Sequence, residues 1–321
     1  TQNISISDEA VKKLDREVEG WAAGLRLVAL ALRHVDEPST LFKRLHGGLP
    51  QIQEYLLREV LGTQSARIRD CLLASSILDR FCVELLDTIC ASPDIDEHPG
   101  FTASDFLEEL QRNNLFTISL DAGGKWFRYH HLFQELLVGE LQRLRGPDQV
   151  AALHLRASQW LEGESLIDEA IQHALAADNV ERAAELVVRH RHEALNESRW
   201  YVLDKWLALV STGTVQQHAE LLMARAWIAL SYHYKVETVP PLLAQVESLV
   251  GDESGSEQAR GELALCRGYV FWLMGNGAES LQQLEVGLKR SPVSRVEFRS
   301  HAEMVLAQAN QMVGREEEGM R

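Results

Sequence analysis

Two adjacent histidines, His130 and His131, stand where an aromatic run gives way to a helical pattern. The start of a helix presents free backbone amides and the positive end of the helix dipole, and both attract a phosphate group. An imidazole at such a position can donate a further hydrogen bond to the anion. The alternative is a plain strand-to-helix junction, in which one ring packs and the other caps the helix. The residues by themselves favour the plain junction.

Other groups that could do chemistry are weaker candidates. Gly123-Gly124-Lys125 lacks the first glycine and the hydroxyl residue of a Walker A loop, so we predict a turn there. His190 and His192 point to different faces of a helix, and we expect them on a solvated surface rather than at a metal. No HExxH or Gly-x-Ser-x-Gly motif occurs in the sequence. We therefore predict no catalytic residue, no metal site and no enzymatic activity.

The elements around the paired histidines predict a winged-helix module. Leu115–Leu120 is an apolar run of strand-forming residues, Asp121–Gly124 has turn composition, and Trp126–Tyr129 is a second run, which together indicate a β-hairpin. The apolar residues of His131–Leu144 then recur every three or four positions, as in an amphipathic helix. Another predicted helix, Ala103–Gln111, precedes the hairpin. One hairpin between helices in an otherwise helical chain is typical of a winged helix.

The first part of the chain is also expected to be helical. Ser7–Arg33 has an N-capping start, and Gly20 and Gly24 flank a turn at which two helices can approach closely. We assign residues 1–50 to a small helical domain and residues 51–147 to the winged-helix domain. The overall fold class is therefore mainly α, with one β-hairpin.

Beyond Gly146-Pro147 the pattern is helical to the end of the chain, with short breaks. The predicted helices are Val150–Leu161, Ile167–Ala176, Val180–Ala194, Tyr201–Val210, Ala219–Tyr232, Val239–Val250, Glu257–Met274, Ala278–Leu288 and Val296–Val313. Helix pairs recurring at roughly 35 to 40 residues indicate an α-solenoid. We assign residues 148–212 to a helical arm and residues 213–321 to a TPR-like helical-repeat sensor, which is expected to be incomplete.

Individual residues of this array support the assignment. Gly268, Ser280 and Gly287 fall at small-residue positions of the tetratricopeptide template, where paired helices approach closely. Aromatic residues are spread through the array and are expected to pack in the core, with a ligand groove as the alternative. These aromatic residues are Trp200, Tyr201, Tyr232 and Trp272.

Composition restricts the class of protein. The 321 residues carry a net charge of −15, which disfavours direct contact with nucleic acid because phosphate backbones attract clustered Lys and Arg. The four cysteines are widely spaced without a CxxC pair, which indicates reduced thiols and a cytoplasmic protein. The longest apolar stretch is interrupted by Arg26 and Arg33, so no membrane span is predicted.

Four stretches, taken in order, resemble the large LuxR-type regulators of the MalT class, which are STAND signal-transduction ATPases. They are Gly20–Leu27 (GWAAGLRL), Ser75–Phe81 (SSILDRF), Phe127–Phe133 (FRYHHLF) and Asp168–Ala177 (DEAIQHALAA). The resemblance implies a nucleotide-binding domain, a helical domain, a winged helix, an arm, a repeat sensor and a LuxR-type DNA-binding domain. This chain resembles the middle of that series, without the ATPase and DNA-binding domains.

The resemblance also implies two nucleotide-binding residues. His130 corresponds to the histidine of the group's Met-His-Asp motif, which contacts the β-phosphate of ADP, while His131 replaces the aspartate. Gly24-Leu25-Arg26-Leu27 corresponds to a Gly-Leu-Pro-Leu stretch beside the adenine, which places Arg26 where the group has proline. No cofactor is expected in this chain alone, whereas ATP or ADP is expected in the full-length protein.

The implied function is the regulatory, signal-sensing core of an ATP- and inducer-dependent transcriptional activator. Its expected partners are the ATPase and DNA-binding domains in cis, a small-molecule inducer or regulatory protein on the array, and further copies of the full-length protein when active. No membrane partner and no direct nucleic-acid contact by this chain are expected. The alternative from another class is a TPR-like scaffold that binds a protein in its concave groove.

Overall fold

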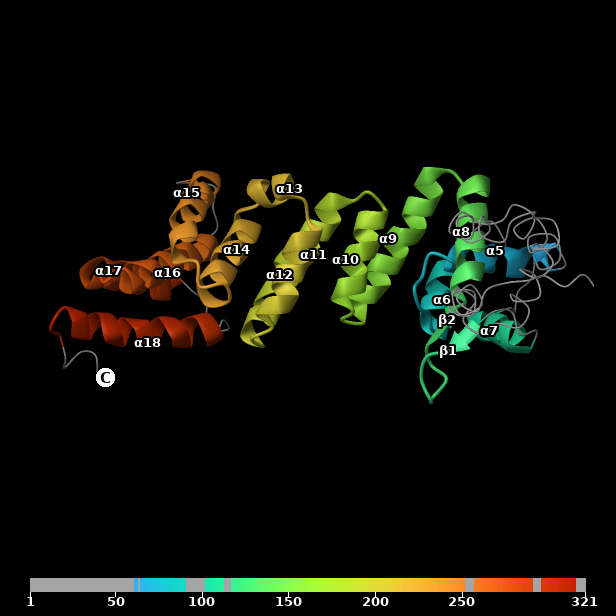
Figure 1. Cartoon of the computed structure of the whole chain (residues 1–321), viewed down its shortest axis with the longest axis horizontal. Helices are drawn as coiled ribbons and strands as arrows, with labels where there is room; N and C mark the ends of the chain where they lie inside the picture. Colours follow the sequence, from blue (N-terminus) through green and yellow to red (C-terminus); the bar gives the residue numbers. More distant parts are fainter. Residues whose placement is uncertain are drawn as a thin grey trace, which may run out of the picture. The chain divides into compact units, whose positions relative to one another are not determined.

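The structure, a computed structural model, describes residues 61–62, 64–90, 102–112, 117–251, 257–290 and 296–315. The predictions for residues 1–50, including Arg26, lie outside the described residues. The chain divides into two compact units, one ending at Trp160 and the other beginning at Leu161 (Figure 1). Each unit is described by itself below.

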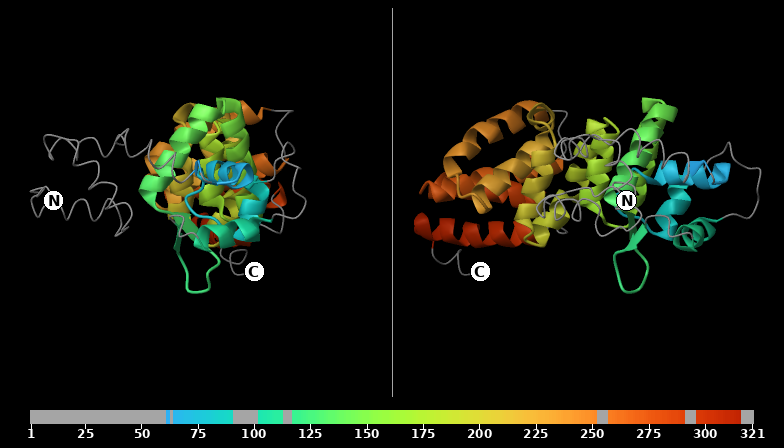
Figure 2. Two further views of the ribbon diagram at one scale, coloured as in Figure 1. Left: turned by 90° about the vertical axis from the view of Figure 1, so that its right-hand side faces the viewer. Right: turned by 45° about the vertical axis from the view of Figure 1, so that its right-hand side comes forward.

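The first unit combines helices with one antiparallel hairpin, as the sequence predicts. Its elements are α5 (Ala66–Ser75), α6 (Val83–Cys90), α7 (Ala103–Arg112), β1 (Thr117–Ser119), β2 (Phe127–Tyr129), α8 (His131–Leu144) and most of α9 (Pro147–Gly163). Strands β1 and β2 pair with Thr117 opposite Tyr129 and Ser119 opposite Phe127, and they form the one sheet found in the described part of the chain. The turn of the hairpin projects from the helices of this unit as a loop (Figures 1 and 2).

Asp121 closes the turn of the hairpin. Its carboxylate accepts hydrogen bonds from the backbone amides of Lys125 at 3.0 Å and Trp126 at 2.8 Å. Gly124 has a φ of 63°, a backbone conformation that glycine adopts readily. Gly123-Gly124-Lys125 is therefore a turn, as predicted, and not a phosphate-binding loop.

Aromatic residues of the core of the first unit pack where the hairpin contacts the segment around Phe81, which follows α5. Phe81 and Phe127 exchange two backbone hydrogen bonds of 2.8 and 2.9 Å, so this segment pairs with β2. Phe127 and Tyr129 are buried while Arg128 between them is half-buried, which is the alternation that a strand requires. The rings of Phe81 and Tyr129 lie 4.7 Å apart, and the ring of Phe133 from α8 lies 5.7 Å from that of Tyr129.

The second unit is an array of helices that follow one another with short connections (Figures 1 and 2). They are α10 (Ile167–Ala176), α11 (Val180–Asn196), α12 (Trp200–Leu209), α13 (Thr212–Gln217), α14 (Ala219–Ser231), the 3-10 helix η2 (Val236–Thr238), α15 (Val239–Val250), α16 (Glu257–Leu273), α17 (Gly277–Arg290) and α18 (Val296–Met312). The sequence did not predict α13 or η2. The first begins with a Ser211 cap, whose hydroxyl accepts a hydrogen bond from the Thr214 amide at 3.1 Å, and contains residues of low helix propensity.

Small residues allow α16 and α17 to approach closely. A Cβ atom added at Gly268 would lie 2.6 Å from the Leu284 side chain, and one at Gly287 would lie 2.5 Å from that of Leu265. The Ser280 hydroxyl donates to the backbone carbonyl of Gly268 at 2.8 Å. Leu265 meets Gly287, and the later residue Gly268 meets the earlier residue Leu284. The two helices therefore run antiparallel. The close approach occurs at the positions that the sequence analysis identified as small.

Candidate functional site

His130 lies at the predicted strand-to-helix junction, directly after β2 and before α8. It is the N-cap residue of α8, with φ −60° and ψ 136°, and its backbone carbonyl accepts the amide of Gln134 at 2.9 Å. Its side chain makes no capping hydrogen bond to the helix. His131 is exposed and its Nε2 lies 3.6 Å from a carboxylate oxygen of Glu135, one turn further along α8. The two imidazoles therefore have different surroundings.

Two stretches far apart in the sequence hold this junction. The Tyr129 hydroxyl lies 2.7 Å from the Ser75 hydroxyl, and both side chains are buried. The Gln134 side-chain amide donates to the backbone carbonyls of Ser76 at 3.0 Å and Leu78 at 2.9 Å. Burial raises the pKa of the Tyr129 hydroxyl, so it stays neutral across the physiological range. The Ser75–Phe81 and Phe127–Phe133 stretches singled out in the sequence thus pack against each other.

The junction brings together groups of the kinds that bind anions in proteins. Arg128 is half-buried, and its guanidinium group donates a hydrogen bond of 3.2 Å to the backbone carbonyl of Tyr129, the residue directly before His130. The first backbone amides of α8 have no carbonyl partner within the helix. Imidazole, guanidinium and helix amides are the groups that proteins use to bind phosphate.

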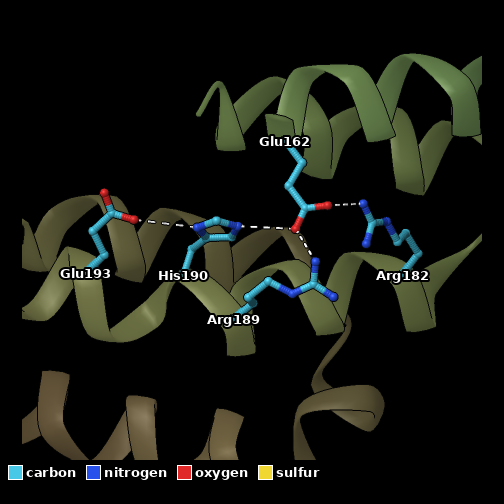
Figure 3. A network of polar contacts seen from close by, with 5 residues as sticks. All are labelled: Glu162, Arg182, Arg189, His190 and Glu193. Atoms are coloured by element: carbon cyan, nitrogen blue, oxygen red, sulfur yellow. Dashed lines mark hydrogen bonds and ion pairs between the residues drawn. The ribbon is translucent and has the colours of Figure 1, made fainter. Parts of the chain in front are cut away.

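In the second unit, Glu162 is the centre of a cluster of ionic contacts (Figure 3). Its carboxylate contacts Arg182, lies 2.5 Å from Nη1 of Arg189 and lies 3.3 Å from Nε2 of His190. The other ring nitrogen of His190 lies 3.6 Å from Glu193. Burial raises the pKa of Glu162, but the hydrogen bonds and positive charges of its partners outweigh burial and hold the pKa below its usual range. The cluster joins the end of α9 to α11.

A second ionic contact in this unit is buried. The Arg191 guanidinium donates two hydrogen bonds to the Glu262 carboxylate, of 2.8 and 2.9 Å, and the exposed fractions of the two side chains are 4% and 3%. His192 Nε2 lies 3.9 Å from the same carboxylate. The predicted solvated surface for His190 to His192 is therefore wrong. Since α11 packs against helices on more than one side, polar residues on several of its faces meet other helices instead of water.

A pocket of about 340 Å³ lies between α12, α14 and α15. Asp204 from α12 lines it, and the Asp204 carboxylate lies 3.3 Å from Nε2 of His233, which also lines it. Tyr232, next to this histidine, is 44% exposed, and Tyr201 on α12 is 63% exposed. Core packing was therefore the wrong prediction for these two tyrosines, because both side chains are exposed.

The described residues contain no group of three or more His, Cys, Asp or Glu side chains arranged to hold a metal ion. Within the same residues, no helix is both long and apolar enough to span a bilayer. All four cysteines are free thiols; Cys71, Cys82 and Cys266 are buried and Cys90 is half-buried.

Fold and junction together define a winged-helix protein with an appended array of helices. Residues 57–150 match the family described as MalT winged helix domain. The HTH-type transcriptional regulator MalT of Klebsiella pneumoniae is 28% identical over 296 residues, which cover 92% of this chain and 31% of that protein. The MalT of Yersinia enterocolitica is 28% identical over 316 residues, which cover 97% of this chain and 34% of that protein.

The serine/threonine-protein kinase PknK of Mycobacterium tuberculosis is 34% identical over 218 residues, which cover 68% of this chain and 19% of that protein. The chain thus spans about a third or less of the length of the curated relatives it matches. The resemblance to MalT-type regulators is confirmed, and residues 57–150 form a winged-helix domain of the MalT type.

Proposed function

We propose that this chain is the signal-sensing core of an ATP- and inducer-dependent transcriptional activator of the LuxR type. The observation that carries the proposal is the position of His130 at the start of α8, held by contacts between two stretches that the resemblance singles out. Similarity to transcriptional regulators over most of the chain supports the regulatory role. The helical array with its pocket supports a receiving role for the second unit.

In this proposal the junction binds a nucleotide in the resting state. The winged helix and a neighbouring ATPase domain would together hold ADP, whose phosphate would supply the anionic group. His130 would donate a hydrogen bond to that anion, and the charge of Arg128 and the amides of α8 would favour its binding. The buried contact between Tyr129 and Ser75 and the bonds from Gln134 keep the histidine in place.

Ligand binding to the helical array would shift the equilibrium away from this resting state. A ligand shifts a two-state equilibrium only as far as its affinities for the two states differ. We propose that an inducer or regulatory protein prefers the state in which the winged helix has released the nucleotide. ATP exchange and self-association of the full-length protein would then follow. The chain alone is expected to hydrolyse no ATP.

The test uses the full-length protein with His130→Ala and His131→Ala as a matched pair. A hydrogen bond to a charged group contributes about 1.5–3 kcal/mol, so losing the one from His130 should raise inducer-independent transcription about 10-fold or more. His131→Ala should leave it unchanged, because this residue is exposed and its imidazole lies 3.6 Å from the Glu135 carboxylate. Unchanged basal transcription in His130→Ala would remove His130 from the mechanism.

The scaffold alternative makes a different prediction. A scaffold should retain a stable protein partner in a pull-down and show no thermal shift with small molecules. The pocket between α12, α14 and α15 favours the small-molecule interpretation, because pockets that bind small ligands are concave and largely apolar.

A further inference from the structure

The pocket in the second unit is lined by buried apolar residues and by charged residues. Leu207, Ile228 and Ala229 line it as buried residues, together with Leu242 of α15. Its volume of about 340 Å³ lies within the range of about 300–1,000 Å³ that is usual for small-molecule sites. The pocket is therefore suited to a compact ligand rather than to a folded partner.

Two cations at the pocket have no counter-charge bound to them among the described residues. Arg225 on α14 and Lys235 beside η2 both line the pocket, and neither side chain makes a hydrogen bond or ion pair with any described residue. The one carboxylate in the lining, Asp204, lies 3.3 Å from His233 instead. Arg225 is half-buried, and a charged group withdrawn from water is costly unless it has a partner. The pocket is thus locally positive in a chain whose net charge is −15.

We propose that this pocket binds a small amphipathic anion, with a carboxylate or phosphate group against Arg225 and Lys235 and an apolar portion against Leu207 and Ile228. A guanidinium group binds either anion through two parallel hydrogen bonds, and an ammonium group adds a point charge. A neutral ligand of the same size would leave both cations without a counter-charge. This ligand would be the inducer of the proposed function, so its regulatory role rests on that function. The pocket then gives the chemical class of the inducer.

The experiment measures binding of simple probes to the 321-residue chain by isothermal titration calorimetry. Phenyl phosphate and benzoate represent the two anion types, and phenol is their neutral counterpart. Both anions are expected to bind at least 10-fold more tightly than phenol. Better binding of phenyl phosphate or of benzoate identifies which anion the site prefers, and either result supports the proposal.

Substitutions of pocket residues test whether the anions bind in this pocket. Arg225→Gln should weaken binding of the preferred anion about 10- to 100-fold, because a charge-assisted hydrogen bond is lost. Lys235 is exposed, so Lys235→Glu should leave folding intact while it weakens binding at least 5-fold. Lys289→Gln is the control, since Lys289 is an exposed lysine on α17 that does not line the pocket, and it should not change the affinity. Circular dichroism checks that each variant folds.

Three results would overturn the proposal: no binding of either anion, equal affinity for phenol and the anions, or unchanged affinity in folded Lys235→Glu. Tighter binding of an acidic peptide than of both probes would also overturn it, in favour of a protein partner. These outcomes are independent of the transcription test. If the anions fail to bind but His130→Ala still raises basal transcription, the pocket assignment is wrong and the proposed function stands.

Discussion

The junction at His130 and the helical array are stabilised by different kinds of interaction. In the first unit, a buried hydroxyl pair, an amide bonded to backbone carbonyls and packed aromatic rings hold the junction, and none of these groups is charged. In the second unit, charged pairs such as Arg191–Glu262 and the Glu162 cluster join helices that are distant in sequence. Neutral contacts depend little on pH and salt, whereas ionic contacts depend on both. In the proposed function, the first unit would supply a fixed contact and the second unit would respond to a charged ligand.

The largest effect is expected from the buried pair. Glu262→Gln should destabilise the second unit by about 3–5 kcal/mol, because it leaves the Arg191 charge buried without a counter-charge. The measurement is the free energy of unfolding in urea. Replacing both residues, with Arg191→Met and Glu262→Leu, should recover most of the loss.

Glu247→Gln is the matched control for this prediction. Glu247 pairs with Arg267 at 2.6 Å, but 60% of its side chain is exposed, so the expected loss is only about 0–1 kcal/mol. Equal losses from Glu262→Gln and Glu247→Gln would show that burial of the Arg191 pair has no energetic importance.

A smaller effect is expected at Glu162, and it depends on pH. The pKa of Glu162 is lower in the folded chain than its ordinary value of 4.5. The stability it contributes is therefore fully present above pH 4.5 and is lost as the pH falls through the folded-state pKa. Glu162→Gln should lower stability at pH 7 and reduce the slope of stability against pH below 4.5. An unchanged slope would exclude the Glu162 cluster as a source of acid sensitivity.

The smallest effect is expected at the uncharged contact between the Tyr129 and Ser75 hydroxyls. Tyr129→Phe should reduce stability by about 0.5–1.5 kcal/mol, because one hydrogen bond is lost while the Ser75 hydroxyl keeps its 2.6 Å bond to the Cys71 carbonyl. The loss should be the same at pH 3.5 and pH 7, in contrast to the loss from Glu162→Gln. Thermal unfolding at both pH values measures it, with the exposed Tyr201→Phe as control. A loss that differs between the two pH values would contradict the uncharged character of the Tyr129–Ser75 contact.

Local patterns in the sequence predicted most of the helices and the hairpin. The bounds of α8, α10 and α15 were correct to the residue, because apolar periodicity and abrupt polar breaks mark their ends. The position of His130 before α8 was also predicted correctly, because the change of period falls there.

Interactions between distant segments could not be predicted in the same way. Arg191 and Glu262 are 71 residues apart, and no local pattern indicates that they meet. For the same reason the residues 190–192 were wrongly expected on a solvated surface, and the pocket around Asp204 and Arg225 was not identified. Such sites depend on how three or more helices pack, which local propensity does not specify.

The most direct test of the central claim is the affinity of the full-length protein for ADP, measured for the unmodified protein, His130→Ala and His131→Ala. If His130 binds the phosphate, His130→Ala should weaken ADP binding about 10-fold or more, as expected for one charge-assisted hydrogen bond. His131→Ala should bind ADP like the unmodified protein. Equal ADP affinity in all three proteins would contradict the assignment of the junction as a nucleotide contact.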